Sequence, residues 1–252
     1  MEIPRSFIDG YDSSMSDAIG QLQTELKAAL DTVDYSRPTD EVRREVIAIM
    51  DAYCDAASAT GARISAEFYA GLRQMATGKD NILSLQTGRN PKDTERAVKA
   101  FMQQLIDGDE DAFDDLLLER LELETKKAAA YNTIDNVRND PLNPRFARVP
   151  TGEKTCDFCL MLASRGPVYL SEESAGAFTQ FHAHCDCKVV PFFDSSFNGL
   201  SRRKSKTTIE GYDPDEYYRQ YQELMKNPTY EARMARASQR AKDRARERAK
   251  QR

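Results

Sequence analysis

The chain has 252 residues, of which 40% are apolar and 31% are charged, and its formal net charge is −5 at pH 7. These values exclude a disordered chain and suit a helix-rich globular protein with one large core or two modest ones. No apolar stretch approaches the roughly 18 residues that a membrane helix needs, and the start, MEIPRSFIDGYDSS, lacks the pattern of a secretory signal. We therefore expect a cytoplasmic protein without membrane contact, whose thiols stay reduced.

The first half of the chain predicts long helices. Apolar residues recur at steps of three or four from Met15 to Val33, which places them on one helical face, and Ser14 with Asp17 resembles a capping box at the start. A longer helix is expected to begin at Thr39 and to stop at Gly78, because glycine suits a helix C-terminus.

Two further helices are expected before the character of the chain changes. One begins near Pro91 and ends near Gly108, and the next runs from about Asp111 to Arg138. The sequence NDPLNPRFARVPTG then breaks the helical pattern, and short strands are predicted at residues 146–149, 167–171 and 188–193 from their β-branched and aromatic content.

The C-terminal region predicts a short helix and then a basic tail. The helix begins at Asp213 and Pro214, and Asn227 with Pro228 breaks it. From residue 231 to the end there are nine Lys or Arg residues and three acidic residues, so this segment has a net charge of +6 and the rest of the chain has −11. Arginines recur every four residues at Arg236, Arg240, Arg244 and Arg248. Such a stripe can follow phosphates, and a solvated, frayed helix is the alternative interpretation.

Four of the five cysteines cluster with both histidines. Cys156 and Cys159 form a C-x2-C pair, and Cys185 with Cys187 forms a C-x-C pair. His182 and His184 directly precede the second pair. Zinc prefers four nitrogen or sulfur donors in a tetrahedron, so this spacing in a reducing compartment predicts a bound metal. The four cysteines are one ligand set, and His182 in place of one C-x-C cysteine is the other.

A structural role is the preferred interpretation of this metal site. Four protein ligands leave no open position for water, and several thiolates make the metal a poor Lewis acid. No glutamate near the cluster stands out as a general base. The fifth cysteine, Cys54, lies in the long predicted helix and is interpreted as a small buried apolar residue.

The cysteine region resembles a known family of phage proteins. RVPTGEKTCDFCLMLASRG followed by FHAHCDCKVVPFF is similar to the phage Mu F-like minor head proteins, in the form found in phages of actinobacteria. That family's pattern of C-x2-C, a spacer and H-x2-C-x-C falls on Cys156, Cys159, His182, Cys185 and Cys187, so the resemblance favours His182 over His184.

This resemblance implies a function as well as a ligand set. It covers residues 130–195 well and implies a minor capsid protein, made in few copies, that associates with the portal, assists head assembly and helps DNA packaging or delivery. The protein would occupy the host cytoplasm during assembly and then the virion, at the capsid interior or portal vertex. It implies no small-molecule substrate, and we expect no enzymatic activity.

Two other functions compete with this one. A capsid-maturation hydrolase would need an activated thiolate beside a histidine, or an open metal position. A zinc-containing DNA-binding protein unrelated to virions would need a basic face on the cysteine cluster, where only Lys154, Arg165 and Lys188 lie nearby in sequence.

The expected fold class is α+β and mainly helical. Long N-terminal helices precede a small α+β unit with the zinc knuckle, and a basic helix ends the chain. The expected divisions are a helical domain at 1–138, a knuckle domain at 139–198, a basic linker at 199–212 and a C-terminal helical tail at 213–252.

Overall fold

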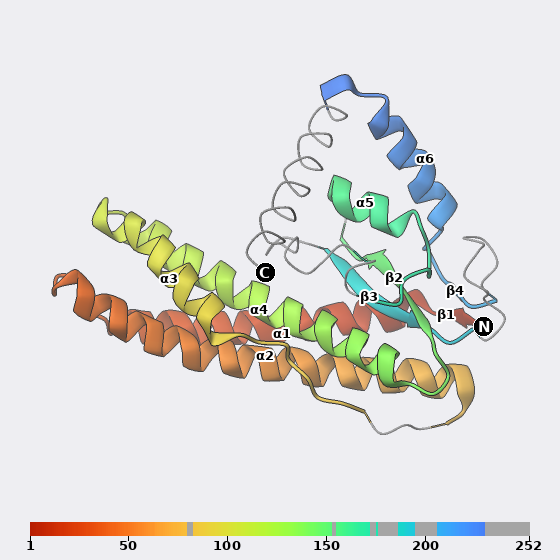
Figure 1. The fold of residues 1–252 in the computed structure, drawn as a ribbon, viewed down its shortest axis with the longest axis horizontal. Helices are drawn as coiled ribbons and strands as arrows, with labels where there is room; N and C mark the ends of the chain where they lie inside the picture. Colours follow the sequence, from red (N-terminus) through yellow and green to blue (C-terminus); the bar gives the residue numbers. More distant parts are fainter. Residues whose placement is uncertain (80–82, 153–154, 172–174, 176–185, 195–205, 230–252) are drawn as a thin grey trace, which may run out of the picture.

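The computed structural model describes residues 1–79, 83–152, 155–171, 175, 186–194 and 206–229. Its largest part is an elongated bundle of four helices (Figure 1). These are α1 (Arg5–Leu30), α2 (Thr39–Thr77), α3 (Pro91–Ile106) and α4 (Glu110–Asn139). The mainly helical α+β class predicted from the sequence is confirmed for these residues.

The ends of three bundle helices follow from local chemistry, as predicted. Gly78 takes the left-handed conformation, with φ 66°, and closes α2. Asn90 accepts a hydrogen bond from the Lys92 amide at the start of α3, and Asp109 accepts one from the Ala112 amide at the start of α4. Each cap satisfies an amide that would otherwise lack a partner within the helix.

The predicted start of the first helix is wrong. Helix α1 begins at Arg5, directly after Pro4, and Ser14 lies inside it. The Ser14 hydroxyl donates to the carbonyl of Gly10, one turn earlier, at 2.9 Å, and so does not cap the N-terminus of the helix. The reason is that Ile8 and Tyr11 are buried and extend the apolar face of the helix toward the N-terminus.

The bundle holds a core of its own at the end farther from the chain's strands. Helices α1, α2, α3 and α4 all contribute to it, and Cys54 lies in its centre with no exposed surface. Burial, followed by the nearby Glu124 carboxylate, raises the pKa of the Cys54 thiol to about 11. Its interpretation as a buried apolar residue is therefore confirmed.

A small sheet packs on the other half of the bundle. Strand β2 (Arg145–Pro150) pairs antiparallel with β3 (Cys187–Phe192), so that Arg148 faces Val189 and Pro150 faces Cys187. Helix α5 (Asp157–Ala163) covers the sheet, and α6 (Pro214–Met225) packs on α5 (Figure 1). The strands predicted at 146–149 and 188–193 are thus confirmed.

The strand predicted at residues 167–171 is instead a single bridge. The amide of Phe146 donates to the carbonyl of Tyr169 at 3.0 Å, and the reverse bond measures 3.2 Å. Gly166, with φ 69°, turns the chain directly before it. This turn leaves too few residues in register with β2 to continue the ladder.

A second strand pair joins the N-terminal residues to a segment near residue 208. Strand β1 (Glu2–Ile3) lies parallel to β4 (Thr208–Ile209), with Ile3 opposite Ile209. Ile3, Ile209 and Tyr212 share one buried cluster with α1, α2 and the β2–β3 sheet. The described end of the expected basic linker is thus part of the core, while the domain boundaries stay predictions.

Among the described residues, none of the helices combines the length and apolarity needed to cross a bilayer.

Candidate metal centre

Three of the predicted metal ligands meet where the sheet adjoins α5. Cys187 is the first residue of β3, Cys156 is the N-cap of α5, and Cys159 lies in the first turn of that helix. This helix was not predicted from the sequence. Its N-terminus carries both cysteines of the C-x2-C pair, and Cys159 lies against Cys187 at the start of β3.

The three sulfur atoms form a compact, largely buried group. The Sγ atoms of Cys159 and Cys187 lie 2.9 Å apart, and the amide of Cys159 donates to the Sγ of Cys156 at 3.4 Å. Cys159 and Cys187 are 1% and 4% exposed, whereas Cys156 is half-buried. Thiols so placed are the soft donors that zinc prefers, and their chemistry fits the predicted ion.

The remaining predicted ligands, His182 and Cys185, and the alternative His184 lie outside the described residues. Within the described part of the chain, no group of three or more His, Cys, Asp or Glu side chains has the arrangement of a metal site. A tetrahedral zinc shell needs four donors, so zinc binding by Cys156, Cys159 and Cys187 stays a prediction.

A buried arginine that the sequence analysis missed faces these sulfurs. Arg148 lies in the middle of β2, is 1% exposed, and places its Nε 3.2 Å from the Sγ of Cys187. Its Nη2 lies 3.9 Å from the Sγ of Cys159. A charged residue inside the apolar run FARVP was the available signal, because arginine is almost never fully buried unless it has a partner.

Asp186 holds the two halves of the cysteine cluster together. Its carbonyl accepts hydrogen bonds from the amide and the hydroxyl of Thr151, at 3.3 and 2.5 Å. Its Oδ2 accepts one from the hydroxyl of Thr155 at 3.2 Å. These bonds fix the segment before Cys156 against the segment before Cys187, so the thiols meet through backbone geometry as well as packing.

Two tyrosines fix the other end of α5. The hydroxyl of Tyr169 donates to the carbonyl of Leu162 at 2.8 Å, and that of Tyr212 donates to the carbonyl of Ala163 at 2.7 Å. Burial raises the pKa of Tyr169 to about 12, so it stays a neutral donor. The last carbonyls of the helix are thereby satisfied, and α5 is held at both ends.

The space beside Cys187 is small. A cavity of about 20 Å³ is lined by Cys187, Tyr11, Met15 and neighbouring residues of α4 and β3. This volume holds about one water molecule. A substrate of peptide size does not fit into this cavity.

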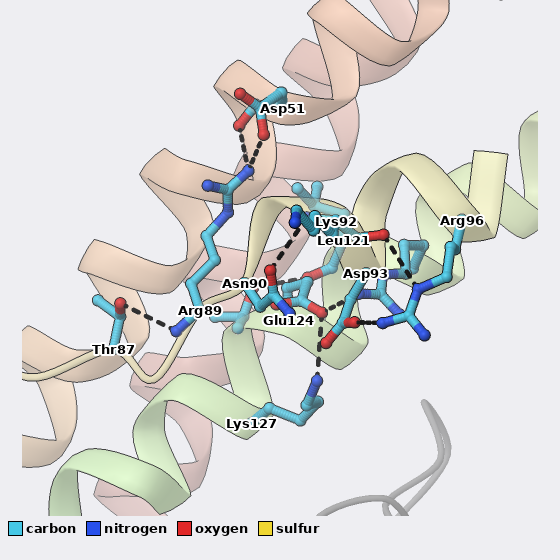
Figure 2. Close-up of polar contacts among 12 residues, drawn as sticks. Asp51, Thr87, Arg89, Asn90, Lys92, Asp93, Arg96, Leu121, Glu124 and Lys127 are labelled. Carbon is cyan, nitrogen blue, oxygen red and sulfur yellow. Dashed lines mark hydrogen bonds and ion pairs between the residues drawn. The ribbon is translucent and has the colours of Figure 1, made fainter. Parts of the chain in front are cut away.

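A second polar cluster lies in the bundle, away from the cysteines. Figure 2 shows Arg89 reaching from the segment before α3 to Asp51 of α2, with Glu124 of α4 facing Lys127. The guanidinium also donates to the main-chain carbonyl of Asp51 at 2.9 Å. The Arg89 contacts fasten the segment before α3 to α2, and the Glu124–Lys127 pair lies within α4, so both sets of contacts are structural.

The predicted contact residues of the basic tail, Arg236, Arg240, Arg244 and Arg248, lie outside the described residues. Their contact with nucleic acid or a partner stays a prediction.

Comparisons with known proteins point to phages. The family model described as VG15 protein matches residues 2–224. The Gene 15 protein of Mycobacterium phage D29 is 36% identical over 102 residues, which covers 28% of this chain and 37% of that protein. The Gene 15 protein of Mycobacterium phage L5 is 34% identical over 110 residues, with the same two shares. The chain thus spans well under half the length of these curated relatives, and no solved structure matches it.

Proposed function

The chain belongs to the VG15 protein family and is a phage protein of the actinobacteriophage type, and from this premise we propose that it is a minor capsid protein that acts in head assembly. One observation carries the proposal. Cys187 follows Cys159 by 28 positions in sequence, yet Cys156, Cys159 and Cys187 of the minor-head pattern meet in one largely buried group.

In this proposal the cysteine cluster is a structural zinc knuckle. Cys156, Cys159 and Cys187 would hold the ion together with His182 or Cys185. Zinc, when bound, supplies a cross-link between the α5 segment and β3 that a short, polar stretch of chain lacks. Asp186 and the two tyrosines then orient the segments that the ion joins.

Burial supports the structural role over the alternative of a capsid-maturation hydrolase. A nucleophilic thiolate must reach its substrate, yet Cys159 and Cys187 are almost fully covered. The half-buried Cys156 has its sulfur engaged as the N-cap acceptor of α5. The hydrolase remains the second hypothesis, to be tested by protease assay if the chain binds no metal.

The remaining parts of the chain suggest where partners would bind. The elongated bundle in Figure 1 offers a long outer surface for portal or capsid proteins. The tail with Arg236, Arg240, Arg244 and Arg248 would contact phage DNA or an acidic protein face. The protein would act in the host cytoplasm and end in the virion, at the capsid interior or portal vertex.

Metal content tests the knuckle. We expect about one zinc per chain in the purified wild type by mass spectrometry, and its loss with a lower thermal midpoint in Cys159→Ser. Cys54→Ala is the matched control, because this thiol is buried in the bundle core and should keep the zinc while costing some stability. A folded wild type without metal contradicts the knuckle and frees the thiols for catalysis.

Head assembly is tested in the phage that encodes the chain. A nonsense mutation in the gene should reduce the yield of normal heads in electron micrographs, and the wild-type protein should be found in purified virions at low copy number. Normal heads from the mutant, with the protein absent from wild-type virions, would refute the assignment.

A further inference from the structure

Arg148 is an almost fully buried cation beside the cysteine cluster. It is the largest of the fully buried side chains, and it projects from the centre of β2 toward the cysteine cluster. Its Nε and Nη2 both donate to the sulfur of Cys187, and Nη2 also lies 3.9 Å from the sulfur of Cys159. These two thiols come from different elements, β3 and α5, so the guanidinium spans the junction that the metal would close.

A guanidinium in this position is costly to bury unless negative charge lies beside it. Thiolates that bind a metal supply such charge, because three or four of them outweigh the two positive charges of zinc. Asp186 adds a carboxylate at the same junction. The charge of Arg148 therefore suits a loaded metal centre.

We propose that Arg148 is a positioning residue of the metal centre, which donates hydrogen bonds to its thiolates and offsets their charge. The proposal rests on the zinc knuckle proposed above. The guanidinium suits this role because its N–H donors point in fixed directions within one plane. A lysine would perform it poorly, because its ammonium group is a point charge on a flexible stem and cannot hold two sulfurs in fixed directions.

The proposal predicts unequal effects on the two forms of the protein. With zinc bound, loss of Arg148 removes hydrogen bonds to ligands, and such losses commonly weaken metal affinity by about 10- to 100-fold. After zinc is removed, Arg148 no longer holds metal-bound ligands, so its replacement should lower the unfolding temperature of the metal-free protein less than that of the zinc-bound protein.

The experiment uses the full chain as wild type, Arg148→Met and Arg148→Lys. Zinc affinity is measured by competition with a chromophoric chelator, and thermal unfolding is followed by helical circular dichroism before and after chelation. We expect about 10- to 100-fold weaker zinc binding in Arg148→Met and an intermediate loss in Arg148→Lys. Arg148→Lys also keeps the test available if the methionine variant does not fold.

Arg73→Met is the matched control. Arg73 is a buried arginine on α2, 5% exposed, whose Nε lies 2.7 Å from the Oδ2 of Asp140. Its replacement should lower the thermal midpoint of both forms and leave zinc affinity unchanged.

Three results would overturn the role of Arg148. Unchanged zinc affinity in Arg148→Met with a zinc-binding wild type refutes this inference alone. An equal loss of thermal stability in both forms, as in the control, shows a merely structural residue. A wild type without zinc refutes the proposed knuckle and this inference together.

Discussion

Helices α2 and α4 approach so closely at Gly61 that a methyl group there should force them apart. A Cβ at Gly61 would lie 2.3 Å from the carbonyl oxygen of Thr125, whereas ordinary contacts begin at 3.4 Å. The obstacle is backbone, which cannot rotate away, so the helices must separate by about 1 Å. Overpacking of this kind costs about 1–3 kcal/mol, partly offset by the gain of about 0.5–1 kcal/mol for alanine over glycine in a helix.

Gly20→Ala isolates the steric part of this cost. Gly20 is a helical, exposed glycine of α1, and a Cβ at this position would have nothing within 4 Å, so its substitution brings the propensity gain alone. Urea unfolding of both variants, followed by circular dichroism, should place Gly61→Ala below Gly20→Ala by about 1–3 kcal/mol. If the free energies of unfolding of the two variants agree within about 0.5 kcal/mol, α2 and α4 do not approach each other at Gly61 as closely as described.

Three further predictions concern other parts of the chain. Burial alone would raise the pKa of Asp140, but hydrogen bonds from Arg73, Leu142 and Tyr69 outweigh burial and lower the pKa. The ionised Asp140 carboxylate therefore stabilises the folded protein at pH values above the unfolded pKa of about 3.9. This stabilisation is lost as the pH falls through the folded pKa. Asp140→Asn should cost about 3 kcal/mol at pH 7 and progressively less below about pH 4 in urea titrations, and a pH-independent difference would contradict this. Thr155→Val should cost about 1 kcal/mol in the same assay by removing the bond to Asp186; no change would mean that this bond does not hold the cluster. Alanine at all four tail arginines should flatten the slope of log affinity for DNA against log salt by about 3.6 if each meets one phosphate, whereas an unchanged slope would assign DNA contact elsewhere.

The sequence predicted the elements that have strong local signals. Gly78, Pro91 and the acids before α4 mark helix ends through backbone chemistry alone, so those helices appear within a residue or two of expectation. The meeting of the cysteines was predicted for a similar reason, because ligands of one metal ion must be spaced along the chain so that they can all reach it. The structure brings Cys156, Cys159 and Cys187 together but does not describe the other two expected ligands.

The missed features depend on contacts between distant residues. Helix α5 is too short for a periodic pattern to be distinguished from a turn. The burial of Arg148 becomes evident only when β3 supplies Cys187 across the sheet. Helix α1 extends to Arg5 because its first turns pack against residues that lie much later in the chain.

The pairing of β1 with β4 has a consequence for the order in which the protein folds. Ile3 meets Ile209, a partner more than 200 positions away, so this contact closes a loop that includes most of the molecule. On the ribosome the start of the chain emerges first, and β1 has no partner strand until residue 209 has been made. We therefore expect the bundle helices to assemble early through their more local contacts, and β1 to dock late. In pulsed hydrogen exchange during refolding, the amide of Glu210, which donates to the carbonyl of Ile3, should be protected after those of the α2–α4 pair.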